Sequence, residues 1–244
     1  MRVRFAGSGD AFGSGGRWQT CIHVSSPGNA MLVDCGATSP AALKAQGLDP
    51  NGISAVVISH LHGDHFGGLP YLILDGQFSR RSEPLLVAGP PGIADRLTTT
   101  MEALYPGSSR VHRRFDVRVS ELPTDGTPVK LGNATIRGWE VDHACGAPPL
   151  ALRVELDGSC FAYSGDTAWT PALCQAAAGA DLFAAEAYTF DRQVKYHLDY
   201  RTLREHLCEL RASRIMLTHM SADMLARLPD ADLPTAHDGL AVTL

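Results

Sequence analysis

The chain has 244 residues, of which 45% are hydrophobic and 19% are charged, with a formal net charge of −5 and an isoelectric point near 6.0. These values are typical of a globular protein with a sizeable core, and they give no overall electrostatic reason to bind a polyanion such as nucleic acid. We therefore expect a single domain over residues 1–244.

The N-terminal residues and the cysteines indicate the compartment. Met1–Phe5 lacks the apolar stretch of a signal peptide, and no later run reaches the length of a membrane span. The six cysteines form no CxxC pair, a pattern typical of reduced thiols rather than of a disulfide framework. The sequence therefore predicts a cytoplasmic protein with no membrane partner.

Two strands and a helix are predicted in the same order in each half of the chain. In the first half they fall at Thr20–Val24, Ala30–Asp34 and Pro40–Gln46. In the second half they fall at Leu150–Leu156, Cys160–Gly165 and Pro171–Ala178. Two such halves, each a sheet covered by helices, would form an α/β (or α+β) protein built as a four-layer αββα sandwich.

Between these two blocks, the apolar stretch Ile53–Ser59 leads into the sequence His60-Leu61-His62-Gly63-Asp64-His65. Imidazole and carboxylate are the ligands expected for a borderline divalent ion such as zinc. A strand followed by a tight turn at Gly63 would let His60 and His62 point one way and Asp64 and His65 another. The motif therefore predicts two adjacent metal sites, with a histidine-rich surface loop as the alternative.

Three more apolar, β-rich runs end in candidate ligands. Ala134–Val141 leads into Asp142-His143, Cys160–Ser164 leads into Asp166, and Arg214–Thr218 leads into His219. The carboxyl ends of strands in α/β proteins open into a crevice where ligands bind, so these side chains are expected at one rim. The alternatives are a packed or surface histidine for His143 and a helix cap for Asp166 or His219.

These residues suffice for two metal ions. One ion would take His60, His62 and His143, the other would take Asp64, His65 and His219, and Asp166 would bridge them. Paired ions about 3.5–4 Å apart lower the pKa of bound water and clamp the attacking and leaving oxygens. The sequence thus predicts a hydrolase that uses a metal-bridging hydroxide and no organic cofactor, with zinc expected and manganese or iron as alternatives.

The chain resembles the metallo-β-lactamase-fold hydrolases, in the branch that contains tRNase Z and cyclic phosphodiesterases. The resemblance rests on Gly7-Ser8-Gly9-Asp10, Asp34, His60–His65, His143, Ser164-Gly165-Asp166-Thr167 and Thr218-His219. It implies the αββα fold, the ligand roles given above and a possible homodimer. It also implies that Asp34 braces the histidine-rich loop through hydrogen bonds; an ordinary buried aspartate bonded to backbone is the alternative.

Two further segments resemble the phosphodiesterases of this branch more than its other members. The apolar run Asp181–Glu186 is followed by Ala187-Tyr188-Thr189-Phe190 and then by Tyr196-His197-Leu198. They resemble the Glu-Ala-Thr-Phe element and downstream histidine of the phosphodiesterases, except that Tyr188 is inserted. The resemblance implies that His197 faces the metals and protonates the leaving oxygen, helped by a neighbouring carboxylate. The candidate catalytic residues are Asp64, His197 and Glu186; a surface or helix-capping role is the alternative for His197.

The expected function is therefore hydrolysis of a small or cyclic phosphodiester. A carbonyl substrate (a lactone, thioester or β-lactam) is the alternative, and a non-catalytic protein that binds a metal or ligand is a third hypothesis. Processing of tRNA 3′ ends is less expected, because the hairpin Leu150–Tyr163 nearly fills the segment where some tRNases Z insert a long arm. Loops at Leu69–Glu83 and Ala144–Pro149 are expected to set substrate selectivity.

Overall fold

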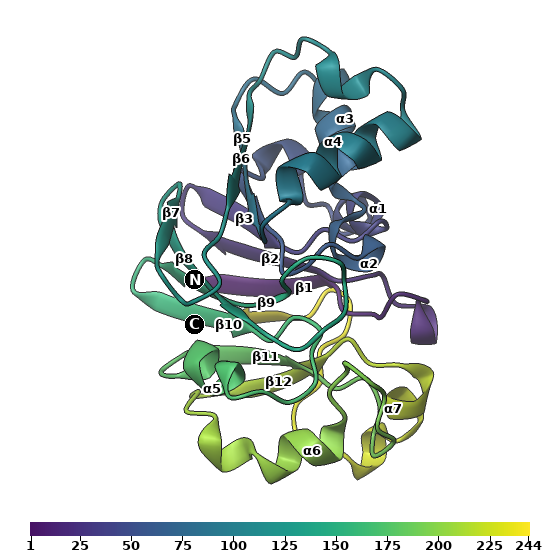
Figure 1. Ribbon diagram of the computed structural model, residues 1–244, viewed down its shortest axis with the longest axis vertical. Coiled ribbons are helices and arrows are strands. Elements are labelled where there is room, and N and C mark those ends of the chain that lie inside the picture. The colour runs from purple at the N-terminus through teal and green to yellow at the C-terminus, as the bar shows by residue number, and fades with distance from the viewer.

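The computed structural model describes residues 1–244 and contains two mixed β-sheets (Figure 1). The seven-stranded sheet has the order β13 (Ala241–Thr243), β1 (Arg2–Gly7), β2 (Cys21–Ser26), β3 (Asn29–Val33), β4 (Ala55–Val57), β5 (Leu85–Gly89) and β6 (Val117–Glu121). The six-stranded sheet has the order β12 (Ile215–Thr218), β11 (Leu182–Glu186), β10 (Ser159–Tyr163), β9 (Leu150–Leu156), β8 (Ala134–Glu140) and β7 (Val129–Leu131).

Helices cover the outer face of each sheet. Those of the first half are α1 (Ser39–Ala45), α2 (Gly63–Phe66), α3 (Leu69–Phe78) and α4 (Ile93–Leu104). Those of the second half, at the bottom of Figure 1, are α5 (Ala172–Ala177), α6 (Tyr200–Glu205) and α7 (Ala222–Ala226). None of these helices combines the length and the apolar composition that crossing a bilayer requires.

Three apolar clusters hold the layers together. The largest contains 22 buried residues and lies between the sheets, since it joins Phe5 of β1 to Phe161 of β10. A second cluster packs α3 and α4 on the first sheet, and a third packs α5 and α6 on the second sheet. Three interfaces of this kind separate four layers, which confirms the predicted αββα sandwich.

The repeat predicted from the sequence is present in the topology. In the first half β2 and β3 pair antiparallel and β4 then pairs parallel to β3. In the second half β9 and β10 pair antiparallel and β11 then pairs parallel to β10. The helices α1 and α5 follow the second strand of each block, as the sequence predicts.

One predicted loop is wrong. Most of Leu69–Glu83 forms the ten-residue helix α3 rather than a selectivity loop. Leu69, Leu72 and Ile73 are buried at helical spacing, and Pro70 lies in the first turn, where its missing N–H is not needed. This periodicity is the signal that the interpretation as a loop overlooked.

The cysteines agree with the sequence prediction of unpaired thiols. All six are free, and four of them are buried. Burial raises the pKa of the Cys21 thiol to about 12, so that this side chain packs as a small neutral group.

Candidate metal centre and its neighbouring histidine

The histidine-rich motif divides at the start of a short helix. His60 and His62 lie in the connection after β4, whereas Asp64 and His65 lie within α2. His62 is the N-cap residue of α2 and keeps an extended backbone, with φ −76° and ψ 153°. Because the backbone changes from extended to helical at this point, the side chains on the two sides of it leave in different directions.

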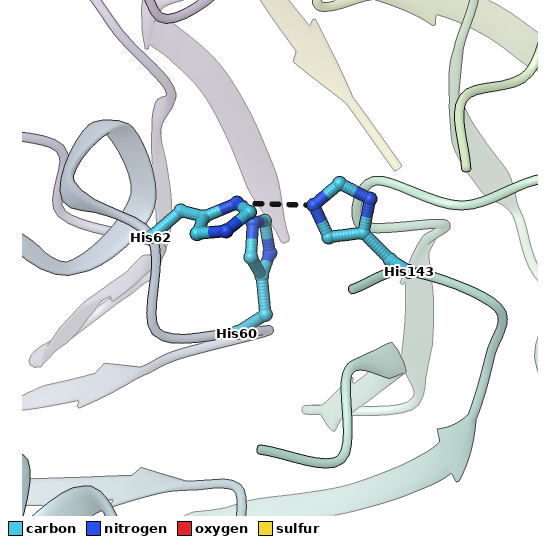
Figure 2. Close-up of side chains that lie close together, drawn as sticks. All are labelled: His60, His62 and His143. Carbon is cyan, nitrogen blue, oxygen red and sulfur yellow. Dashed lines mark hydrogen bonds between the residues drawn. The ribbon is translucent and has the colours of Figure 1, made fainter. Parts of the chain in front are cut away.

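The first cluster consists of His60, His62 and His143 (Figure 2). His143 follows β8 in the other sheet and extends toward the two histidines of the β4–α2 loop. Its Nε2 atom lies 3.0 Å from Nδ1 of His62. One ring nitrogen from each of the three residues falls within 4.8 Å of the others.

The second cluster consists of four buried residues, Asp64, His65, Asp166 and His219. The Nε2 atoms of His65 and His219 are 3.2 Å apart, and Oδ2 of Asp64 lies 3.2 and 3.3 Å from them. Asp166 places Oδ1 3.3 Å from Nε2 of His65. Its Oδ2 is 3.9 Å from Nε2 of His60, so Asp166 lies between the two clusters.

Several features of these clusters fit divalent metal ions. The buried atoms Nε2 of His60 and Oδ1 of Asp166 have no hydrogen-bond partner in the chain. Two imidazole nitrogens bound tetrahedrally to one zinc ion lie about 3.4 Å apart, close to the two nitrogen separations found here. Unpaired buried donors and acceptors are costly, so this donor set is suited to a binuclear site.

The charges around the clusters also favour cations. Burial alone would lower the pKa of His219, but the carboxylates of Asp166, Asp64 and Glu186 raise it to about 10. His60, which is fully buried beside other imidazoles, has its pKa held well below the usual value for histidine. The carboxylates thus produce a negative potential, while His60 stays in the neutral form that binds metals.

Asp34 holds one residue of each cluster in place. Its Oδ2 accepts hydrogen bonds from Nδ1 of His65 and from Oγ of Ser59, both at 2.7 Å, and its Oδ1 accepts from the Ser59 backbone N–H. Ser59 Oγ is also 3.1 Å from Nδ1 of His60. The contacts of Asp34 therefore combine the bracing expected from the resemblance with the backbone bond of its alternative. Ser59 was overlooked, although its position directly before His60 was a usable signal.

Backbone hydrogen bonds and close packing from residues 35–37 fix the β4–α2 loop and the start of α2. The Cys35 N–H donates to the carbonyl of His65 at 2.6 Å, and the Ala37 N–H donates to the carbonyl of Gly63 at 3.1 Å. A Cβ atom on Gly36 would lie 2.1 Å from the carbonyl oxygen of Asp64, so any side chain there would displace the loop. The glycine permits the close approach that keeps the ligands in position.

His197 and Glu186 form a pair beside both clusters. Nδ1 of His197 donates to Oε1 of the buried Glu186 at 2.5 Å. The other Glu186 oxygen accepts the backbone N–H groups of Thr167 and Leu198, at 2.9 and 3.2 Å. Burial opposes protonation of His197, but the bond and charge of Glu186 raise its pKa above the ordinary value. This bond occupies Nδ1 of His197 and leaves Nε2 as its other ring nitrogen.

Two tyrosines surround His197. The ring of Tyr188, the inserted residue, stacks on the His197 ring with centroids 4.5 Å apart and planes 28° apart. Tyr196 has a left-handed backbone, with φ 68°, and its carbonyl accepts a hydrogen bond from Nδ1 of His143 at 2.9 Å. The role of Tyr196 was overlooked, because a backbone carbonyl contact has no side-chain signature in the sequence.

The helix caps predicted as alternatives are absent. The N-cap residue is Pro171 for α5, Asp199 for α6 and Ser221 for α7. Asp166, His197 and His219 therefore do not occupy these cap positions, and all three side chains belong to one group of converging ligand atoms that also includes Glu186.

The comparison that decides the family is the match of residues 1–232 to the model of the anti-Pycsar protein Apyc1. The chain belongs to the Apyc1 family. It is similar to a ribonuclease Z of Mycobacterium marinum, with 32% identity over 190 residues that cover 74% of this chain and 68% of that protein. This protein is a metal-dependent hydrolase, and its two His/Asp clusters form the candidate binuclear site.

Solved structures confirm the fold. Human tRNase Z, short form, superposes with a TM-score of 0.81 at 24% identity and covers 100% of this chain and 99% of that chain. The metallo-β-lactamase fold protein YhfI of Bacillus subtilis gives 0.78 at 18% identity, covering 99% of each chain. Zinc-bound PqqB of Methylobacterium extorquens gives 0.76 at 17% identity, covering 100% of each. These structures confirm the expected metallo-β-lactamase fold, and the Apyc1 family match together with the ribonuclease Z relative confirms the expected branch.

Proposed function

We propose that this protein is a phosphodiesterase that hydrolyses cyclic nucleotides. The Apyc1 family degrades such compounds, which supports a small cyclic phosphodiester as the substrate. The observation that carries the proposal is the His197–Glu186 pair beside the two ligand clusters. An alkoxide is a poor leaving group from phosphorus, so an acid held beside the two clusters would assist its departure from a phosphodiester.

The proposed ligands are His60, His62 and His143 for one ion, and Asp64, His65 and His219 for the other, with Asp166 shared between them. Two bound divalent ions would polarise the phosphoryl oxygens and acidify water. We propose zinc for both positions, because imidazole and carboxylate suit it and because PqqB, which has the same fold, binds zinc.

The proposed role of His197 is that of general acid. In the hydrolysis, a water molecule loses one proton to solvent and its oxygen forms a bond to phosphorus, while the bond from phosphorus to the leaving oxygen breaks. The proton on Nε2 of His197 passes to that leaving oxygen, which departs as an alcohol. Glu186 stabilises the protonated ring before the transfer and fixes its orientation, so Glu186 acts as a positioning residue.

A small substrate agrees with the surroundings of the clusters. The segment between His143 and Asp166 consists mainly of the β9–β10 hairpin, whose strands lie inside the second sheet. No long arm that could grip a tRNA extends from this segment. We therefore propose that nucleic acid is not the substrate.

The test is steady-state hydrolysis of bis(p-nitrophenyl) phosphate and of 3′,5′-cyclic nucleotides. The protein is stripped of metal and then reloaded separately with zinc and with manganese. We expect turnover of both substrates to require metal and to be abolished in Asp64→Ala. Turnover of cyclic nucleotides, whose leaving alkoxide needs a proton, should fall roughly 10²–10⁴-fold in His197→Ala without loss of bound metal. Bound metal is measured by elemental analysis of the same samples.

Three results would oppose the proposal in different ways. Full activity of His197→Ala on cyclic nucleotides would contradict the proposed role of His197 as the acid. Two bound ions without any phosphodiesterase activity would favour a lactone or thioester substrate, both of which are assayed in parallel. Cleavage of a precursor tRNA at a rate above that of cyclic nucleotides would indicate a ribonuclease.

A further inference from the structure

A cavity of about 490 Å³ lies directly beside His197. Its walls come from the Gln193–Asp199 loop, from Asp142 and from Trp169. This volume falls within the range of roughly 300–1,000 Å³ that is usual for small-molecule sites. A larger cavity of about 960 Å³ lies between α1, α3 and α4 and contains none of the clustered ligands. Of these two cavities, only the one beside His197 is lined by a residue of the proposed catalytic site.

The position of His197 determines which part of a substrate lies in this cavity. Nδ1 of His197 is occupied by Glu186, so Nε2 must approach the leaving oxygen within hydrogen-bond distance. His197 forms part of the cavity wall, so the cavity is the space next to the proposed acid that is large enough to hold the skeleton of a leaving alcohol.

The cavity walls have the chemistry to recognise a flat, polar ring. Trp169 stacks on His206 with centroids 4.0 Å apart and planes 9° apart, so its indole is held in a fixed orientation. Asp142 and Gln193 are exposed and offer a carboxylate and an amide to a ligand. A nucleobase presents a π-face for stacking together with N–H donors and carbonyl or ring-nitrogen acceptors at its edge.

We propose that this cavity binds the nucleoside part of a cyclic nucleotide, with the base against Trp169 and its polar edge toward Asp142 and Gln193. The inference rests on the proposed phosphodiesterase function, because a cyclic nucleotide places its sugar on the leaving oxygen and its base beyond the sugar. The cavity then selects nucleotides from among small phosphodiesters, and the metal ligands and His197 act on the phosphate that all of these substrates share.

The test compares kcat and KM for a purine and a pyrimidine 3′,5′-cyclic nucleotide in three variants. Trp169→Ala should raise KM roughly tenfold and lower kcat much less, since it removes a stacking surface and no reacting group. Trp169→Phe, which keeps an aromatic face, should restore most of the affinity. Phe78→Ala removes an exposed aromatic side chain beside the larger cavity and should change neither constant.

A fourth variant and a binding measurement provide two further tests. Gln193→Ala changes an exposed side chain, so it should fold normally and should also raise KM. Adenosine and cytidine contain no phosphate, so calorimetry with these nucleosides tests the cavity even if the protein hydrolyses no phosphodiester. Unchanged nucleoside affinity and unchanged KM in Trp169→Ala and Gln193→Ala would overturn the proposal. Hydrolysis of bis(p-nitrophenyl) phosphate without hydrolysis of cyclic nucleotides would overturn the nucleoside-binding proposal, although the protein would still be a phosphodiesterase.

Discussion

Backbone strain is concentrated at the candidate metal centre. Five residues other than glycine have a positive φ, and three of them, Asp34, Tyr196 and His219, belong to the site or support it directly. A left-handed backbone costs a residue with a side chain about 1–2 kcal/mol, and such residues persist where the surrounding structure determines their conformation. The folded state is thus less stable by this strain, which fixes the direction of one proposed ligand (His219) and of two hydrogen-bond acceptors (Asp34 and Tyr196).

The first prediction concerns Ser59. Ser59→Ala removes the hydroxyl that joins Asp34 to the ring of His60, so it should weaken metal binding by roughly tenfold to a hundredfold. A competition titration against a zinc chelator measures the effect. Ser54→Ala is the matched control, because the Ser54 hydroxyl binds only the carbonyl of Ala30 at the surface. Equal metal affinity of both variants would show that Ser59 does not position the ligand.

The sequence predicted the side chains of the site better than it predicted their supports. Imidazoles and carboxylates at the ends of apolar runs are visible in a single sequence, and the structure brings all seven proposed ligands together. Their roles as metal ligands remain predictions. The carbonyl of Tyr196 could not be found in this way, because every residue has a carbonyl and only the fold decides where it points.

At the scale of elements, the turn from Val194 to His197 connects two parts of the site. The N–H of His197 donates to the carbonyl of Val194 at 3.0 Å, and Tyr196 occupies the turn position with positive φ. The same turn supplies the carbonyl that binds His143 and the backbone of His197. Its conformation therefore sets the distance between a proposed metal ligand and the proposed acid.

The second prediction tests this turn. Tyr196→Gly relieves the strain but allows the turn to move, so kcat should fall roughly tenfold although metal content stays full. Tyr196→Asn, with a residue that tolerates a left-handed backbone without the freedom of glycine, should retain more activity. Hydrolysis of a cyclic nucleotide and elemental analysis provide the two readouts. If Tyr196→Gly matched the native kcat, rigidity of the turn would be irrelevant to catalysis.

Strands were easier to predict than the exact geometry around them. Apolar, β-rich runs gave the order of β2, β3, β9 and β10, because a strand in this fold is buried on one or both faces. Helix α3 was not predicted, although Leu69, Leu72 and Ile73 recur at helical spacing and are buried. The short helix α2 has only four residues, too few for any periodicity to reveal.

At the scale of the whole molecule, the proposed ligands come from both sheets. His60 and His62 follow β4 of the first sheet, whereas His143 and His219 follow β8 and β12 of the second. Bound ions would therefore link the two halves of the sandwich in addition to the apolar core between them. Any such link stabilises the folded state, because the unfolded chain does not hold the ligands together.

The third prediction follows from this linkage. An ion at a hundred times its dissociation constant adds about 2.7 kcal/mol to the free energy of unfolding. For a chain of this size the melting temperature should then rise by about 5–10 °C when metal is restored to the stripped protein. Scanning calorimetry at several zinc concentrations measures the shift. Asp64→Ala, which lacks a proposed ligand, should show a smaller shift, and a native melting temperature independent of zinc would contradict the link.

The shared carboxylate of Asp34 has a consequence for how the two ions load. Asp34 reaches His65 directly and His60 through Ser59, so an ion that fixes either histidine also fixes the common acceptor. The second ion then binds a histidine that is already ordered. Binding therefore costs less conformational entropy, and the affinity for the second ion is higher than for the first. Loading should therefore be cooperative, and protein with a single ion should be scarce in native mass spectra at half saturation. The enzyme would then respond to zinc supply as a switch rather than in proportion to it.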